Sequence, residues 1–173
     1  MKISSLQNAR YAYAPKLPGM LRNGIADICV KEGEETQSVA DQEKIKALFP
    51  NTYGKKEITF EKGQNTSEAK KQVVGVILSG GQAPGGHNVI CGLYDALKAT
   101  NKENVLYGFK NGPIGLIEDD YVIFDDEYIN EYRNTGGFDI IGSGRTKLET
   151  NEQFAIVAEV CKKHGITAIV IIG

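Results

Sequence analysis

The stretch of residues 73–88 reads VVGVILSGGQAPGGHN, an apolar run followed by a glycine-rich loop. Its first six residues are apolar and mostly β-branched, as is typical of a buried strand. The loop that follows, residues 79–86, holds four glycines and a proline, and an amphipathic pattern begins directly after it. A strand, a glycine loop and a helix N-terminus in this order form anion sites in α/β proteins. The stretch therefore predicts a phosphate site on an α/β sheet.

Strand-like and helix-like segments alternate from residue 73 to the end of the chain. Strands are expected at 73–78, 105–109, 121–124, 138–141 and 166–172, helices at 87–100, 125–133 and 151–164, and a turn at 111–115. Such alternation predicts a doubly wound, mostly parallel, Rossmann-like sheet.

The first 72 residues carry weaker patterns. They predict an extended arm at 1–30, a polar surface linker at 31–38, a short helix at 41–49, a short strand at 57–60 and a polar connection at 62–71. We therefore expect two parts: an N-terminal extension, 1–72, and the first part of an α/β domain, 73–173. The chain ends on its last predicted strand, at the edge where such a sheet places function, so we expect a truncated domain.

The composition excludes several classes of protein. The 173 residues carry a net charge of −2, so there is no basic excess of the kind that nucleic-acid binding needs. No apolar run approaches the about 18 residues of a membrane span. The cysteines Cys29, Cys91 and Cys161 are odd in number and widely spaced, which predicts reduced thiols and no zinc site. A cytoplasmic protein is expected.

The glycine loop matches neither of two common phosphate motifs. It lacks the Gly-Lys-Ser/Thr ending of a P-loop and the spacing of Gly-x-Gly-x-x-Gly. Its glycine pairs, Gly80-Gly81 and Gly85-Gly86, allow backbone N–H groups to approach an anion without interference from a Cβ atom. The alternative is a sharp turn that binds nothing.

A second loop, residues 142–147, follows the strand expected at 138–141. Its sequence GSGRTK supplies two cations. Arg145 has a planar fork suited to phosphate oxygens, and Lys147 adds a point charge. We expect this loop at the same sheet edge as the glycine loop, with an exposed surface loop as the alternative.

Residues for the chemical step are not apparent. His87 either touches an anion or is a polar first-turn residue, and His164 is expected to be structural. The acidic runs 118–120 and 125–127 fit Mg²⁺ less well than a solvated loop and a helix N-terminus. No general base or nucleophile pairing is visible, so the sequence predicts an anion site without its own catalytic group and without metal ligands.

Residues 75–88 resemble the phosphofructokinase family, whose members carry a Ser-Gly-Gly-x-x-Pro-Gly loop for the phosphoryl donor. Residues 108–116 and 142–146 resemble two later loops of that family. The resemblance implies that Gly80, Gly81 and Arg145 bind diphosphate. The further candidates are Lys147, Gly85 and Gly86.

The form of the loop around Gln82 and the N-terminal extension resemble the long, diphosphate-dependent branch of the family. That resemblance implies reversible phosphoryl transfer from diphosphate to fructose 6-phosphate with Mg²⁺, giving fructose 1,6-bisphosphate, in a homodimer. The family's next motif begins Gly-Gly-Asp, of which only Gly173 is present. The catalytic and metal-binding residues are therefore expected downstream, and residues 1–173 alone are expected to form no product.

Three alternatives remain from the sequence. An ATP-dependent 6-phosphofructokinase has the same fold, and a non-catalytic phosphate-binding regulatory subunit needs no downstream acids. A dinucleotide-dependent oxidoreductase needs an acidic residue after the second strand to bind ribose. Residues 107–110, YGFK, argue against it.

Overall fold

The computed structural model describes residues 3–24, 27–63 and 70–173. Parts of the arm predicted at 1–30 and of the connection predicted at 62–71 lie outside the described residues. The described chain divides into two compact units, one within 1–15 and 69–173 and the other within 16–68. The division into 1–72 and 73–173 as extension and domain stays a prediction.

The larger unit is built on a mixed, mostly parallel sheet. Among the described residues its order is β5-β4-β3-β6, formed by β3 (Val73–Leu78), β4 (Val105–Phe109), β5 (Tyr121–Ile123) and β6 (Ala168–Ile172). Strand β3 runs parallel to β4 and β6, while β5 runs antiparallel to β4. The α/β class and these four predicted strands are therefore confirmed.

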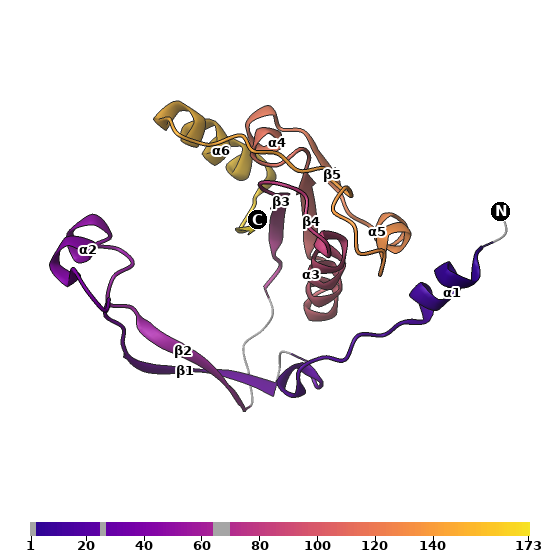
Figure 1. Ribbon diagram of the computed structural model, residues 1–173, viewed down its shortest axis with the longest axis horizontal. Coiled ribbons are helices and arrows are strands. Elements are labelled where there is room, and N and C mark those ends of the chain that lie inside the picture. Colours follow the sequence, from indigo (N-terminus) through magenta and orange to yellow (C-terminus); the bar gives the residue numbers. More distant parts are fainter. Residues whose placement is uncertain (1–2, 25–26, 64–69) are drawn as a thin grey trace. The chain divides into compact units, whose positions relative to one another are not determined.

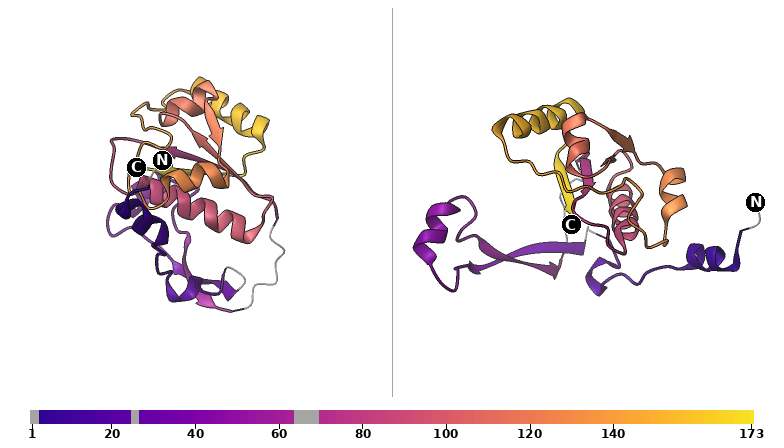
Figure 2. Two further views of the ribbon diagram at one scale, coloured as in Figure 1. Left: turned by 90° about the vertical axis from the view of Figure 1, so that its right-hand side faces the viewer. Right: turned by 45° about the horizontal axis from the view of Figure 1, so that its top comes forward.

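Helices cover both faces of this sheet (Figures 1 and 2). They are α3 (Gly86–Thr100) and α5 (Asp126–Tyr132) on one face and α4 (Pro113–Glu118) and α6 (Asn151–His164) on the other. Side chains alternate along β3, so Leu78 packs in a core with Ile90 and Ile129, whereas Ile77 packs in a second core with Leu116 and Val160. The doubly wound arrangement follows from this alternation.

Residues 138–141 form no strand, contrary to the sequence prediction. They are mostly buried, but their backbone groups bond elsewhere. The N–H groups of Asp139 and Ile140 donate to His87 Nε2 at 2.9 and 3.0 Å, and the Ile141 carbonyl accepts from Asn111 N–H at 2.7 Å. The apolar pattern correctly indicates that these residues are buried. A strand also requires backbone hydrogen bonds to a neighbouring strand, and these residues do not make them.

Two helices differ from their predictions. Residues 111–115 were expected as a turn, but α4 begins at Pro113, whose fixed φ suits a first helical position. In α6 the helical periodicity predicts an apolar face of Phe154, Val157, Ala158 and Cys161, but Phe154 is 53% exposed and Val160 is buried instead.

The predicted extended arm contains a helix, α1 (Ser5–Ala12). Ser4 caps it by accepting a hydrogen bond from Gln7 N–H at 3.1 Å. Asn134 Nδ2 donates to the carbonyl groups of Arg10 and Tyr13 at 2.8 and 3.0 Å, which joins α1 to the larger unit.

The smaller unit is an antiparallel ribbon with a helix at its turn. It contains η1 (Gly19–Leu21), β1 (Ile28–Glu35), α2 (Gln42–Leu48) and β2 (Lys56–Lys62). The helix and strand predicted at 41–49 and 57–60 are confirmed, but most of the predicted linker 31–38 is strand β1. Cross-strand ion pairs of 2.8 Å, Lys31–Glu61 and Lys56–Glu32, offset the charge of this stretch.

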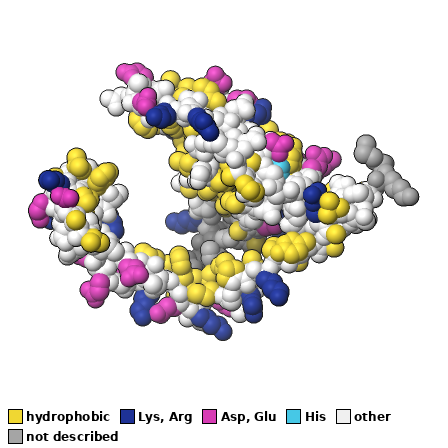
Figure 3. Space-filling model, in the orientation of Figure 1, with side chains coloured by type: hydrophobic (Ala, Val, Ile, Leu, Met, Phe, Trp, Pro, Cys, Tyr) yellow, Lys and Arg dark blue, Asp and Glu magenta, His cyan; other side chains and the backbone are white. Residues whose placement is uncertain are grey.

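Hydrophobic side chains lie on the surface of this unit, visible over α2 in Figure 3. Leu48 and Phe49 are 73% and 57% exposed, and Val30 and Phe60, paired across the ribbon, are about equally exposed. The short ribbon therefore buries little of its own apolar surface.

Candidate functional site

The two loops singled out in the sequence meet at the carboxyl edge of the sheet. Ser79, directly after β3, forms a parallel bridge with Gly144. Gly80 N–H donates to the Gly144 carbonyl at 2.8 Å, and Gly144 N–H donates to the Leu78 carbonyl at 3.3 Å. The carboxyl ends of parallel strands are where open α/β sheets bind ligands. The predicted proximity of the loops is therefore confirmed.

The loop after β4 joins them through contacts between backbones. A methyl carbon placed on Gly144 would overlap the Asn111 carbonyl oxygen. One placed on Gly112 would lie 2.6 Å from Gly144 N and 2.9 Å from the Leu78 carbonyl oxygen, and Gly112 also has a φ of +77°. Only glycine permits this approach.

Arg145 is the cation that this arrangement places beside the glycine loop. A methyl carbon on Gly81 would lie 3.1 Å from Arg145 Nη2, so the guanidinium lies against the Gly81 backbone. Within the described part of the chain, the Arg145 guanidinium and the N–H groups of Gly81 and Gln82 have no hydrogen-bond partner. A planar cation beside free N–H donors matches the oxygens of a phosphate.

The remaining glycines shape the loop. Gly80 and Gly85 have φ values of +99° and +95°, in the left-handed region that favours glycine. Their N–H groups donate to the carbonyls of Gly144 and Gly136, both at 2.8 Å. A methyl carbon on Gly86 would overlap the Phe138 ring. Sequence reasoning could not separate these roles, because each needs the same residue.

Lys147 is highly exposed, and its ammonium lies 3.9 Å from Glu149 Oε1. The described contacts bring Arg145, and not Lys147, against the glycine loop.

His87 is turned into the protein, in agreement with the expectation of a polar first-turn residue. Its imidazole is 3% exposed and bonds to the segment that precedes the Arg145 loop. Burial lowers the pKa of His87, although the neighbouring Asp139 carboxylate acts in the opposite direction.

The acidic runs have structural partners. Asp119 pairs with Lys163 and His164, with N–O distances of 2.6 and 2.7 Å, and Asp120 pairs with Lys110 at 2.6 Å. Asp125 is the N-cap of α5, and its side chain accepts a hydrogen bond from Tyr128 N–H at 2.8 Å. In residues 3–24, 27–63 and 70–173 no group of three His, Cys, Asp or Glu side chains could hold a metal ion.

Asp119→Asn tests the first of these pairs. The hydrogen bond from Lys163, supported by His164, lowers the pKa of Asp119 below its usual 3.8. Asp119 therefore stabilises the fold above about pH 4, and this contribution is lost as the pH falls through its lowered pKa. Because Lys163 is exposed, we expect a loss of about 1 kcal/mol at pH 7. Asparagine tolerates the φ of +55° at this position.

Urea unfolding at pH 7 and pH 3 measures this effect. The difference between wild type and Asp119→Asn should be smaller at pH 3 than at pH 7. Glu159→Gln, an exposed carboxylate-to-amide change on α6, is the control. An equal difference at both pH values would contradict the assignment.

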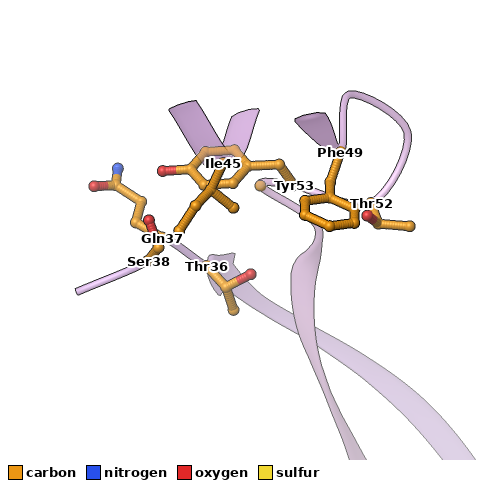
Figure 4. Close-up of a pocket in the computed structure, with 8 residues that line it drawn as sticks. Thr36, Gln37, Ser38, Ile45, Phe49, Thr52 and Tyr53 are labelled. Atoms are coloured by element: carbon orange, nitrogen blue, oxygen red, sulfur yellow. The ribbon is translucent and has the colours of Figure 1, made fainter. Parts of the chain in front are cut away.

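The described residues also line cavities away from the sheet edge. One, of about 290 Å³, lies in the smaller unit, where Figure 4 shows Ile45, Phe49 and Tyr53 around it. Another, of about 510 Å³, is lined by Tyr11 and residues of α5. No helix among the described residues is long and apolar enough to span a membrane.

Curated relatives align with the whole chain, including its first 72 residues. The chain is 51% identical over 173 residues to a protein of Porphyromonas gingivalis named pyrophosphate–fructose 6-phosphate 1-phosphotransferase. It is 42% identical over 182 residues and 43% identical over 173 residues to proteins of the same name from Treponema pallidum and Entamoeba histolytica. The alignments cover 100% of this chain but 31–32% of these relatives. The chain thus spans about a third of their length.

Solved structures share the fold. A pyrophosphate-dependent phosphofructokinase from Marinobacter aquaeolei matches with a TM-score of 0.50 and 21% identity, over 58% of this chain and 25% of that one. The enzyme of that description from Nitrosospira multiformis matches with a TM-score of 0.50 and 24% identity, over 60% and 26%. The phosphofructokinase family model matches residues 73–173, which include β3, the glycine loop and Arg145. The chain therefore belongs to the phosphofructokinase family.

Proposed function

We propose that this chain supplies part of the donor site of an enzyme that transfers a phosphoryl group reversibly from diphosphate to fructose 6-phosphate. The observation that carries the proposal is the Arg145 guanidinium, which lies against Gly81 at the carboxyl edge of the sheet and has no hydrogen-bond partner in the described part of the chain. The names of the relatives supply the donor and the acceptor. The whole activity is a proposal because the chain spans about a third of those proteins.

In this proposal, Arg145 and the Gly81 N–H contact the diphosphate oxygens. Gly80, Gly85 and Gly86 give the loop its shape, since Gly80 and Gly85 use their own N–H groups within the fold. Lys147 adds positive charge nearby. Residues 73–173 are the first part of the donor-binding domain, and residues 1–72 are its extension.

The other components come from the family resemblance. We propose that Mg²⁺ and the catalytic acid–base residues are held by sequence beyond Gly173, as the resemblance implies. We also propose a homodimer in the cytoplasm. The inactivity of residues 1–173 alone stays a prediction.

Turnover assays on the complete gene product test the proposal. With fructose 6-phosphate and Mg²⁺, diphosphate should give fructose 1,6-bisphosphate, and the reverse reaction should run with orthophosphate. Turnover with ATP alone would favour the ATP-dependent alternative. Binding of diphosphate without turnover with either donor would favour a regulatory subunit.

A further inference from the structure

His87 connects the glycine loop to the segment that leads into Arg145. It lies at the start of α3, directly after the loop. Its Nδ1 lies 2.6 Å from Thr135 Oγ1, and its Nε2 lies 2.9 and 3.0 Å from the backbone nitrogens of Asp139 and Ile140. Both nitrogens of one buried ring therefore bond to residues 135–140.

These bonds favour the neutral form of the ring. Backbone N–H groups can only donate, so Nε2 carries a lone pair and Nδ1 carries the proton. Thr135 Oγ1 accepts from Nδ1–H, and its own hydroxyl donates to the Tyr132 carbonyl at 2.6 Å. The neutral imidazole satisfies every group in this chain of hydrogen bonds. A protonated ring would direct its Nε2–H at Asp139 Oδ1, 2.8 Å away, and would lose both bonds from the backbone N–H groups.

The backbone around His87 holds the same segment. Gly85 N–H and His87 N–H donate to the carbonyls of Gly136 and Gly137, at 2.8 and 2.9 Å. Asn88 Oδ1 accepts from Gly136 N–H at 3.2 Å. A methyl carbon on Gly137 would lie 2.5 Å from His87 Cε1. The loop–helix junction is thus fitted closely to residues 136–137.

The groups that face the ring are few. Asp139 Oδ1 lies 2.8 Å from Nε2 on a side chain that is 75% exposed. The Tyr132 ring packs edge-on, with centroids 4.9 Å apart. Burial of the ring favours the neutral form, and Asp139 is the one charged group among the described residues that favours the protonated form.

We propose that neutral His87 is the positioning residue of the donor site: it holds residues 135–140 against the glycine loop and so places Arg145 over Gly81. The inference rests on the proposed function. Protonation of His87 releases the N–H groups of Asp139 and Ile140. Diphosphate binding should therefore weaken as the pH falls.

The test measures kcat and KM for diphosphate from pH 5 to pH 8 in the complete gene product. His87→Gln keeps an oxygen that can accept the two N–H bonds but does not titrate. Wild-type KM should rise severalfold more than that of His87→Gln between pH 7.5 and pH 5, with a smaller difference in kcat. The ionisation of diphosphate is common to all variants and cancels in this comparison.

Three further variants isolate the role of the ring. His164→Gln, at the only other histidine of the sequence, should keep the wild-type pH profile. His87→Ala leaves two N–H groups unpaired and should raise KM about 10- to 100-fold even at pH 8. Asp139→Asn removes the carboxylate that favours the protonated ring, so it should move the rise in KM to lower pH.

The outcomes separate the inference from the proposed function. A wild-type enzyme without diphosphate-dependent turnover would overturn both. Diphosphate-dependent turnover with the same pH profile in wild type and His87→Gln would overturn the inference alone. If His87→Gln does not fold, Asp139→Asn tests the inference instead, because that exposed side chain is replaceable without loss of the fold. A rise in KM that does not move to lower pH in this variant would overturn the inference.

Discussion

Arg145→Ala is expected to raise the KM for diphosphate about 10- to 100-fold, the range of a lost charge-assisted hydrogen bond. The guanidinium lies against Gly81 and has no partner among the described residues, so its removal takes a donor from the anion without leaving a buried group unpaired. For the same reason the free energy of unfolding should change by less than about 0.5 kcal/mol. Steady-state kinetics and urea unfolding of the complete gene product measure both quantities.

Two other variants control for charge alone. Arg145→Lys keeps the charge but loses the planar fork, so it should recover only part of the affinity. Lys147→Ala removes a highly exposed cation two positions after Arg145 in the same loop, and it should change KM by less than about threefold. Equal effects of Arg145→Ala and Lys147→Ala would indicate general electrostatic attraction and contradict a specific contact.

Gly144→Ala is expected to lower the free energy of unfolding by about 2–4 kcal/mol. Its methyl carbon would overlap the Asn111 carbonyl oxygen, a backbone atom that cannot rotate away. Moving the backbone would break the bonds from Gly80 N–H to the Gly144 carbonyl and from Gly144 N–H to the Leu78 carbonyl. The substitution should therefore also raise the KM for diphosphate, because the two loops can no longer pair.

Gly92→Ala is the matched control for this variant. Gly92 lies within α3 with no atom within 4 Å of an added methyl carbon. Alanine there should stabilise the protein by up to about 1 kcal/mol, because it favours the helix. If Gly144→Ala behaved like Gly92→Ala, the close approach of the loops would be wrong.

The sequence alone was sufficient for the framework of the site. The apolar run 73–78 and its glycine loop predicted a strand that ends at an anion site, and the parallel sheet confirmed the position of that loop. The second loop with Arg145 was predicted at the same edge, and the bridge between Ser79 and Gly144 confirmed its position, although the strand expected at 138–141, on which that prediction rested, is absent. The apolar run and the glycine loop are local patterns of burial and backbone freedom, and such patterns can be predicted from the sequence alone.

Other features depended on partners far away in the chain. The polar stretch 31–38 is mostly strand because β2 pairs with it, and the apolar stretch 138–141 is no strand because His87 and Asn111 take its backbone groups. Neither outcome is visible in composition or periodicity.

The different roles of the glycines also depend on the tertiary structure. The sequence determined that residues 79–86 and Arg145 could hold an anion. Only the fold decided that Gly80 and Gly85 use their N–H groups internally, that Gly81 lies under Arg145 and that His87 faces inward. The physical reason is that a hydrogen-bond donor serves a ligand only if no part of the fold already accepts from it, and long-range contacts determine that.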